Sequence, residues 1–170
     1  MRPDEIEAIT EVAHNRGLTV AANTKARESI ANAAHAGVDT IEHGTFLDEE
    51  TAELLIERDI AMTGTLTGQI DIAEKAIEVG GQPDHLVEQL QKEIEILKDA
   101  VALAHDMGVA VIAGTDSGPP HSAQGNVAEE LGYFVEFGNF TPLEAIVAGT
   151  KTTGKYIGLE DVGVLAPDYY

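Results

Sequence analysis

The stretch AHDMGVAVIA, residues 104–113, determines the fold that the sequence predicts, because it joins the end of a helix to an apolar strand. Two earlier stretches have the same order: AHNRGLTVAA at residues 13–22 and AHAGVDTI at residues 34–41. In each, the glycine stands where a helix ends in a left-handed conformation. The apolar run after it is typical of a strand buried on both faces of a parallel sheet.

These units alternate helix with strand, which predicts an α/β fold of about four parallel strands with flanking helices. The expected strands lie near residues 18–23, 38–43, 60–65 and 109–116. The longest expected helix covers residues 84–107, where apolar side chains recur at helical spacing. A closed (β/α) barrel needs eight strands and usually about 250 residues. The 170 residues of this chain are therefore expected to form a single domain, residues 1–170, that is a partial (half) TIM-like barrel.

The composition is strongly acidic: 30 Asp and Glu side chains oppose 10 Lys and Arg, the formal net charge is -20, and cysteine is absent. Without cysteine, disulfides, zinc–cysteine sites and cysteine nucleophiles are excluded. The negative charge argues against nucleic acids and anionic membranes as partners. Dispersal of the acids along the chain favours the surface of a salt-adapted, halophilic protein over a dedicated cation-binding surface. No signal peptide and no apolar run of about 18 residues is found, so a cytoplasmic location is expected.

Polar side chains end two of the predicted strands, at the place where α/β folds put catalytic residues. Glu42-His43-Gly44 ends one strand, and Gly114-Thr115-Asp116 ends another. Imidazole and carboxylate groups are good ligands for zinc and similar divalent ions, so His43 and Asp116 could share a metal. A purely structural role for a histidine at a strand end stays open.

The remaining histidines and one asparagine have more than one interpretation. A histidine near the last turn of a predicted helix, where it interacts with the final carbonyl groups, occurs three times: His14, His35 and His105. His85, near the start of the longest helix, is expected on the surface. His121 follows the strand of Asp116 and either contacts a substrate or is a solvated loop residue. Asn126, before the next helix, either caps that helix or contacts a substrate.

A set of motifs, taken in order, resembles the amidohydrolase superfamily. The motifs are VDTIEHG (residues 38–44) followed by FLDEE (46–50), GTDSG (114–118) with His121, TPLEA (141–145) and GLEDVGVL (158–165). The branch they resemble holds imidazolonepropionase-like and Xaa-Pro dipeptidase-like enzymes. The resemblance covers almost the whole chain, and it implies the C-terminal half of the family's barrel, strands five to eight.

The resemblance implies a metal-dependent hydrolase of small amide, peptide or cyclic amide bonds. His43 matches the family's sixth-strand metal ligand, and Asp116 matches the eighth-strand aspartate that binds the metal and shuttles the proton of the attacking water. The implied cofactor is a divalent metal, with zinc the expected ion, which would activate water and polarise the carbonyl. His121 falls where such enzymes contact substrate. Asn23 departs from the pattern, because the family has a histidine ligand at that position.

Two functions stay open, because catalytic zinc sites usually have three protein ligands and this sequence offers two good ones. The first is a hydrolase of a small-molecule substrate that is incomplete in this chain alone and is completed by a complementing N-terminal half. The second is a non-catalytic half-barrel remnant, or a binding or assembly module, with a decayed metal site. A half-barrel exposes unpaired strand edges, so a homo-oligomer is expected as well.

Overall fold

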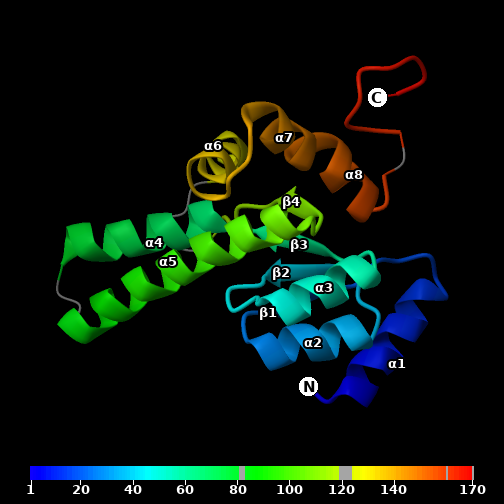
Figure 1. Cartoon of the computed structure of the whole chain (residues 1–170), viewed down its shortest axis with the longest axis horizontal. Coiled ribbons are helices and arrows are strands. Elements are labelled where there is room, and N and C mark those ends of the chain that lie inside the picture. Colours follow the sequence, from blue (N-terminus) through cyan, green and yellow to red (C-terminus); the bar gives the residue numbers. More distant parts are fainter. Residues whose placement is uncertain (81–82, 119–123, 160, 170) are drawn as a thin grey trace.

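The structure, a computed structural model, describes residues 1–80, 83–118, 124–159 and 161–169. Within these ranges four strands form one parallel sheet (Figure 1). The strands are β1 (Ala21–Thr24), β2 (Thr40–His43), β3 (Ala61–Gly64) and β4 (Val111–Ala113). The helices of the described part are α1 (Pro3–His14), α2 (Arg27–His35), α3 (Glu49–Glu57), α4 (Leu66–Val79), α5 (Asp84–Met107), α6 (Val127–Phe137), α7 (Pro142–Val147), the π-helical turn η1 (Ala148–Thr152) and α8 (Thr153–Tyr156).

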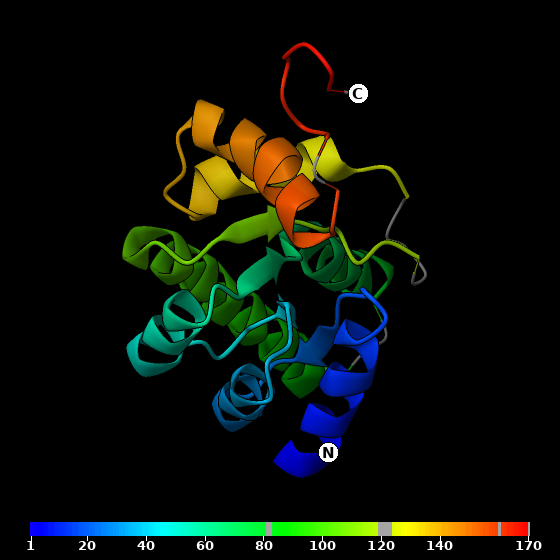
Figure 2. The same ribbon diagram turned by 90° about the vertical axis from the view of Figure 1, so that its right-hand side faces the viewer.

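The strands lie in the sheet in the order of the chain, β1-β2-β3-β4. A doubly wound sheet reverses its strand order at a switch point, whereas consecutive parallel neighbours are the arrangement of a (β/α) barrel. Figure 2 shows α2, α3 and α5 along one side of this sheet. The prediction of a partial TIM-like barrel with flanking helices is confirmed.

One row of side chains across the sheet forms part of the buried core. The row is paired in register and consists of Ala22, Ile41, Met62 and Val111. Ile41 and Met62 are fully buried and pack with the apolar side chains of the helices. The next row, which includes Asn23 and Glu42, points to the opposite side, because successive side chains alternate across a strand. That side corresponds to the interior of the barrel.

The strands begin later than the sequence predicts, because the preceding helix ends use some of the apolar residues. The Leu18 amide still donates to the Ala13 carbonyl at 3.0 Å, and the Val20 amide donates to the Asp39 carboxylate at 2.6 Å. β1 therefore begins at Ala21. β4 is likewise short, Val111–Ala113, because the Val109 amide still donates to the α5 carbonyl of Ala104.

The helix ends follow the sequence more closely than the strands do. α5 spans Asp84–Met107, as predicted, and ends at Gly108 with a φ of 92°. Gly17 and Gly37 have φ angles of 69° and 79° after α1 and α2. Asp48 caps α3 by accepting the Thr51 amide, so the helix begins within the motif FLDEE (residues 46–50).

The two edges of the sheet differ in what covers them. At the outer edge of β4, the Ala113 amide donates to Thr153 Oγ1 at 3.2 Å, and α6, α7 and α8 lie over this strand in Figure 1. No strand among the described residues pairs with the outer edge of β1. On the other side of the molecule, α4 and α5 run side by side and extend beyond the sheet (Figure 1). The sheet is therefore open at β1 and protected at β4.

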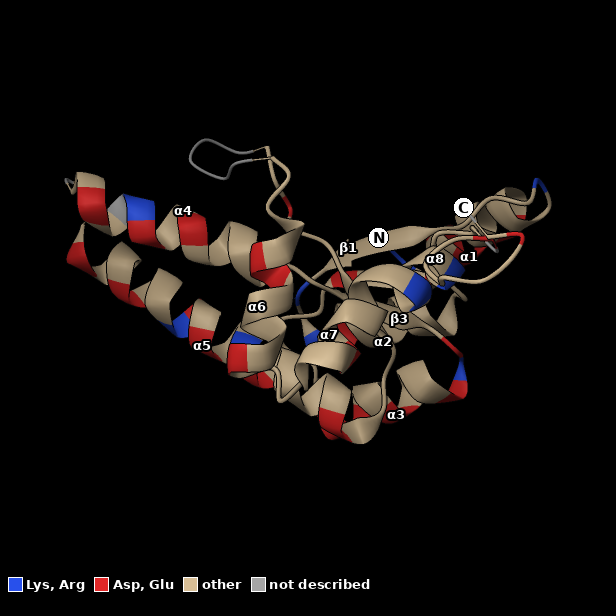
Figure 3. Ribbon diagram, turned by 90° about the horizontal axis from the view of Figure 1, so that it is seen from above, with Lys and Arg blue, Asp and Glu red and all other residues tan. Residues whose placement is uncertain are grey.

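Acidic side chains are spread over α3, α4, α5 and α6 and outnumber the basic ones throughout (Figure 3). None of the described helices is both long enough and apolar enough to span a membrane. That the whole chain is a single domain stays a prediction.

Candidate active site

His43 turns toward the barrel interior through an unusual backbone conformation at the end of β2. His43 and Gly44 both have positive φ angles, 70° and 62°. A Cβ atom on Gly44 would lie 2.6 Å from Met62 Sδ, in the helix-facing core, so the alternation of the strand is reversed at this point. The His43 ring instead lies against the end of β3, with Nδ1 2.9 Å from Thr65 Oγ1. The side chain is nearly buried, at 5% exposure.

Asp116 follows β4 and also has a left-handed backbone, with a φ of 51°. Unlike His43, it is exposed. Non-glycine residues in this conformation are strained, and such strain is concentrated at functional sites. The carboxylate of Asp116 is close enough to His43 to raise the pKa of the imidazole. The structure thus brings together the two site residues that the sequence predicts, at the carboxyl ends of β2 and β4.

Burial is the largest effect on the pKa of His43 and lowers it below its ordinary value. The Asp116 carboxylate opposes this shift, the Lys25 ammonium reinforces it, and Glu42 opposes it. A lowered pKa keeps the imidazole neutral at pH 7. If Nδ1 carries the proton and donates to Thr65, Nε2 keeps a lone pair for a ligand.

Comparison with known proteins gives a match that includes all of these site residues. The amidohydrolase family model matches residues 1–170. The chain belongs to the amidohydrolase family. It is 31% identical over 160 residues to ochratoxinase of Aspergillus niger and 29% identical over 155 residues to an uncharacterised protein of Mycobacterium tuberculosis. These alignments cover 92% and 91% of this chain but 31% and 41% of those proteins.

Solved amidohydrolase structures show the same relationship. The crystal structure of A. niger ochratoxinase superimposes with a TM-score of 0.86 at 30% identity, covering 99% of this chain and 38% of that one. A Xaa-Pro dipeptidase with bound methionine in its active site also gives 0.86 at 30% identity, covering 98% and 40%. This chain therefore spans about two fifths of each solved relative. The predicted resemblance to the amidohydrolase superfamily and its Xaa-Pro dipeptidase-like branch is confirmed.

The described residues of this amidohydrolase chain do not complete a metal centre by themselves. Among them, no group of three or more histidine and acidic side chains is placed to hold a metal ion. Asn23, at the position of the expected third ligand, is exposed on the interior face of β1, and an amide oxygen is a poorer zinc ligand than imidazole. Two residues further on, Lys25 adds a positive charge near His43. Lys25 Nζ lies 3.6 Å from Glu93 Oε2 on α5.

The two predicted substrate-contacting residues are not tested by the structure. His121 lies outside the described residues. Asn126 is the N-cap residue of α6, but its side chain donates to the Glu129 carboxylate instead of accepting a helix amide. The expected cap is thus only positional, and a substrate contact by either residue stays a prediction.

His14, His35 and His105 lie in the last turns of α1, α2 and α5, as predicted, but His14 and His105 contact side chains of other segments. His14 Nε2 lies 2.9 Å from Asp39 Oδ2, and the His105 ring packs on Phe140 with 3.7 Å between ring centroids. His85 is exposed in the first turn of α5.

One buried acid beside the site, Glu130 on α6, is not among the residues predicted from the sequence. Its side chain is fully buried, and its two oxygens accept the amides of Leu66 and Thr67 at 3.0 and 2.7 Å. Burial raises the pKa of Glu130, against the opposing effect of these hydrogen bonds. A signal exists in the sequence, since Glu130 stands one helical turn before Phe134, on the same face. A glutamate on the same helix face as a core phenylalanine indicates a buried carboxylate with polar partners.

Proposed function

We propose that this chain supplies part of the active site of a metal-dependent amidohydrolase that cleaves small amide, peptide or cyclic amide bonds. In this proposal His43 and Asp116 are two of the metal ligands, and the remaining ligands come from residues outside the chain. The observation that carries it is the convergence of a buried imidazole and an exposed carboxylate at one end of the sheet. A bound divalent ion, with zinc the expected one, supplies Lewis-acid chemistry.

Asp116 has the exposure that a proton-transferring group needs. In the proposed reaction its carboxylate takes the proton of the attacking water and returns it to the leaving amine. His43 is held through Nδ1 by the Thr65 hydroxyl, which orients the ring before any substrate binds. Fixed orientation of this kind lowers the cost of reaching the reactive geometry.

One pair of residues favours a second function, a half-barrel binding or assembly module with a decayed site. Asn23 provides only an amide where the resemblance implies an imidazole, and the Lys25 ammonium lies where it repels a cation. Both are on β1 or directly after it, so this strand is where the site departs from catalytic design.

Metal content and hydrolysis together distinguish the two functions. We expect the chain purified without chelator to take up zinc only weakly, and His43→Ala to abolish this uptake. His85→Ala is the matched control, because it removes an exposed histidine in the first turn of α5. Hydrolysis of a panel of dipeptides and N-acyl amino acids is expected once the chain is mixed with the N-terminal half of a related barrel. Asp116→Asn should abolish that hydrolysis.

Failure of both measurements has a clear meaning. If the mixture binds no divalent ion and cleaves no member of the panel, the hydrolase proposal is wrong and the binding or assembly module is favoured. The partner that completes the barrel, whether an N-terminal half or a second copy, belongs to this proposal, as does the expected cytoplasmic location.

A further inference from the structure

The turn of residues 65–68, which joins β3 to α4 and includes the first residues of α4, contacts both candidate site residues. On one side, Thr65 Oγ1 lies 2.9 Å from His43 Nδ1. On the other side, a Cβ atom on Gly68 would lie 3.3 Å from both the Cβ and the carbonyl oxygen of Asp116. The turn is therefore packed directly against the backbone of Asp116. A shift of this one turn displaces both His43 and Asp116.

The buried side chain of Glu130, on α6, is hydrogen-bonded to the backbone of this turn. Its two carboxylate oxygens accept the amides of Leu66 and Thr67, which begin the 14-residue helix α4 and have no partner within that helix. Close contact is possible because residue 64 is glycine: a Cβ there would lie 2.6 Å from Phe134 Cε1 and 3.3 Å from Glu130 Oε1. A buried carboxylate is expensive unless it is fully hydrogen-bonded, so its bonds to the turn restrict where the turn can lie.

We propose that Glu130 is a positioning residue for the His43–Asp116 site. By fixing the turn of residues 65–68, it keeps the Thr65 hydroxyl on His43 Nδ1, and this hydrogen bond sets the balance between the two neutral tautomers of the ring. The tautomer in which Nδ1 donates to the hydroxyl leaves Nε2 for a ligand. The importance of this tautomer for catalysis rests on the proposed function, but the hydrogen-bond relay does not. A residue that only stabilised α4 would leave the His43 tautomer unchanged.

The test is NMR of the full chain with 15N-labelled histidine, at a pH where His43 is neutral and without metal. We expect Thr65→Val to change the ratio of the two His43 tautomers by about two- to tenfold, the effect of losing one hydrogen bond. Glu130→Gln should shift it in the same direction by a smaller factor. Thr65→Ser should restore the wild-type ratio, and Glu136→Gln, an exposed acid on the same helix, should leave it unchanged.

Two results would overturn the proposal. The first is a wild-type tautomer ratio in folded Glu130→Gln, or in Glu130→Asp if the glutamine variant does not fold. The second, which needs no variant, is the absence in the wild-type chain of scalar couplings from the Leu66 and Thr67 amide nitrogens to the Glu130 carboxylate carbon. Neither measurement requires turnover or metal. The positioning role can therefore fail while the chain proves to be part of a hydrolase, and it can hold in an inactive module.

Discussion

Gly44 lies so close to Met62 that a Cβ atom on residue 44 would come within 2.6 Å of the Met62 sulfur. Because Gly44 has no Cβ atom, its backbone can adopt a φ of 62° directly after His43. The Gly44 amide donates to the carbonyl of Thr24 at 3.1 Å. The glycine therefore both accepts the left-handed conformation and leaves space for the core. Met62 fills the helix-facing side of the sheet next to Gly44. The His43 imidazole lies on the opposite side, which faces the barrel interior.

We predict that Gly44→Ala destabilises the fold by about 2–5 kcal/mol, the sum of a left-handed alanine and an overpacked core. The matched control is Gly17→Ala. Gly17 has a similar φ of 69° but nothing within 4 Å of the added carbon, so it should lose only about 1–2 kcal/mol. Urea unfolding of the two variants measures the difference. Equal losses would show that the contact with Met62 has no energetic weight.

The sequence predicts the architecture well because short stretches of sequence specify most of the helices and strands. Helix ends with glycine, apolar runs and the helical period of residues 84–107 each specify one element. The order of the strands in the sheet is expected from the resemblance to a (β/α) barrel. The site is predicted only in part. His43 and Asp116 are visible as strand-end residues, whereas the Glu130 relay depends on contacts across 64 and 63 residues of sequence. The late start of β1 is missed for the same reason, since Val20 bonds to a side chain, Asp39.

Asn23 offers a gain-of-function test of the incomplete metal site. It lies on β1 beside β2, where it is in register with Glu42 and one residue before the partner of His43. We predict that Asn23→His raises zinc affinity at least about tenfold, because a third ligand brings the set to the number that zinc sites use. Isothermal titration calorimetry measures the change. In Asn23→His combined with His43→Ala the gain should vanish, and its persistence would show that the new histidine binds zinc elsewhere.

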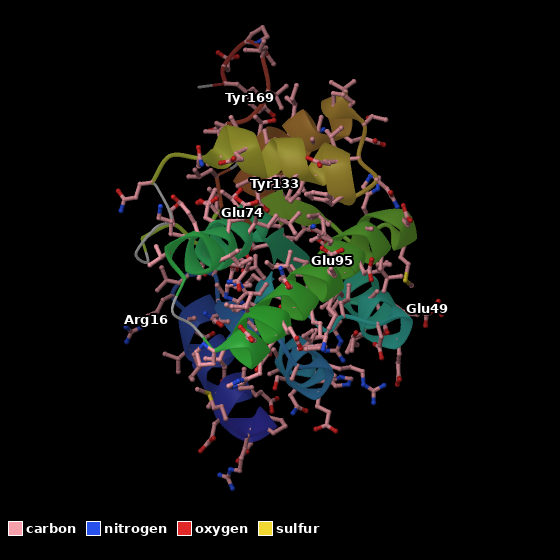
Figure 4. All side chains as sticks on the ribbon, turned by 90° about the vertical axis from the view of Figure 1, so that its left-hand side faces the viewer. Arg16, Glu49, Glu74, Glu95, Tyr133 and Tyr169 are labelled. Carbon is pink, nitrogen blue, oxygen red and sulfur yellow. The ribbon has the colours of Figure 1, made fainter. Side chains whose placement is uncertain are left out.

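Tyr133 reports the acidity of the surface between α4 and α6, where Figure 4 shows it beside Glu74. Burial, followed by the charges of Glu129, Glu74, Asp71 and Glu136, raises the pKa of Tyr133 from 10.0 to about 12. At a pH between 10.0 and about 12, the folded protein therefore keeps the phenol proton of Tyr133, whereas the unfolded chain releases it.

Stability is therefore predicted to fall as the pH rises from 10.0 to about 12, and the fall should be smaller in Tyr133→Phe. Denaturant midpoints of both proteins across this range give the comparison. Added KCl should shrink the difference, because salt screens the carboxylates but not the burial. A difference that stays constant with pH would show that Tyr133 titrates equally in both states.

The open edge of β1 is predicted to be a contact between chains, and its formation should depend on salt. β1 ladder bonds use alternate residues: the Val20 and Thr24 carbonyls accept amides from β2 and the turn after it, so the Ala21 amide points to the open edge. A chain of net charge -20 repels a second copy, and raising KCl from about 0.1 M to about 1 M shortens the screening length from about 10 Å to about 3 Å.

Sedimentation velocity at the two salt concentrations should show dimers appearing with KCl, accompanied by a higher melting temperature. An uncharged osmolyte such as sucrose, which favours burial without screening charge, should promote dimers less. Ala21→Pro is the deciding variant. Proline removes an outward amide and leaves the bonds between β1 and β2 in place, so this variant should keep the salt-dependent melting temperature yet stay monomeric. Dimers that persist in Ala21→Pro would place the contact on another surface, and a wild-type chain that is monomeric in high salt would contradict the prediction.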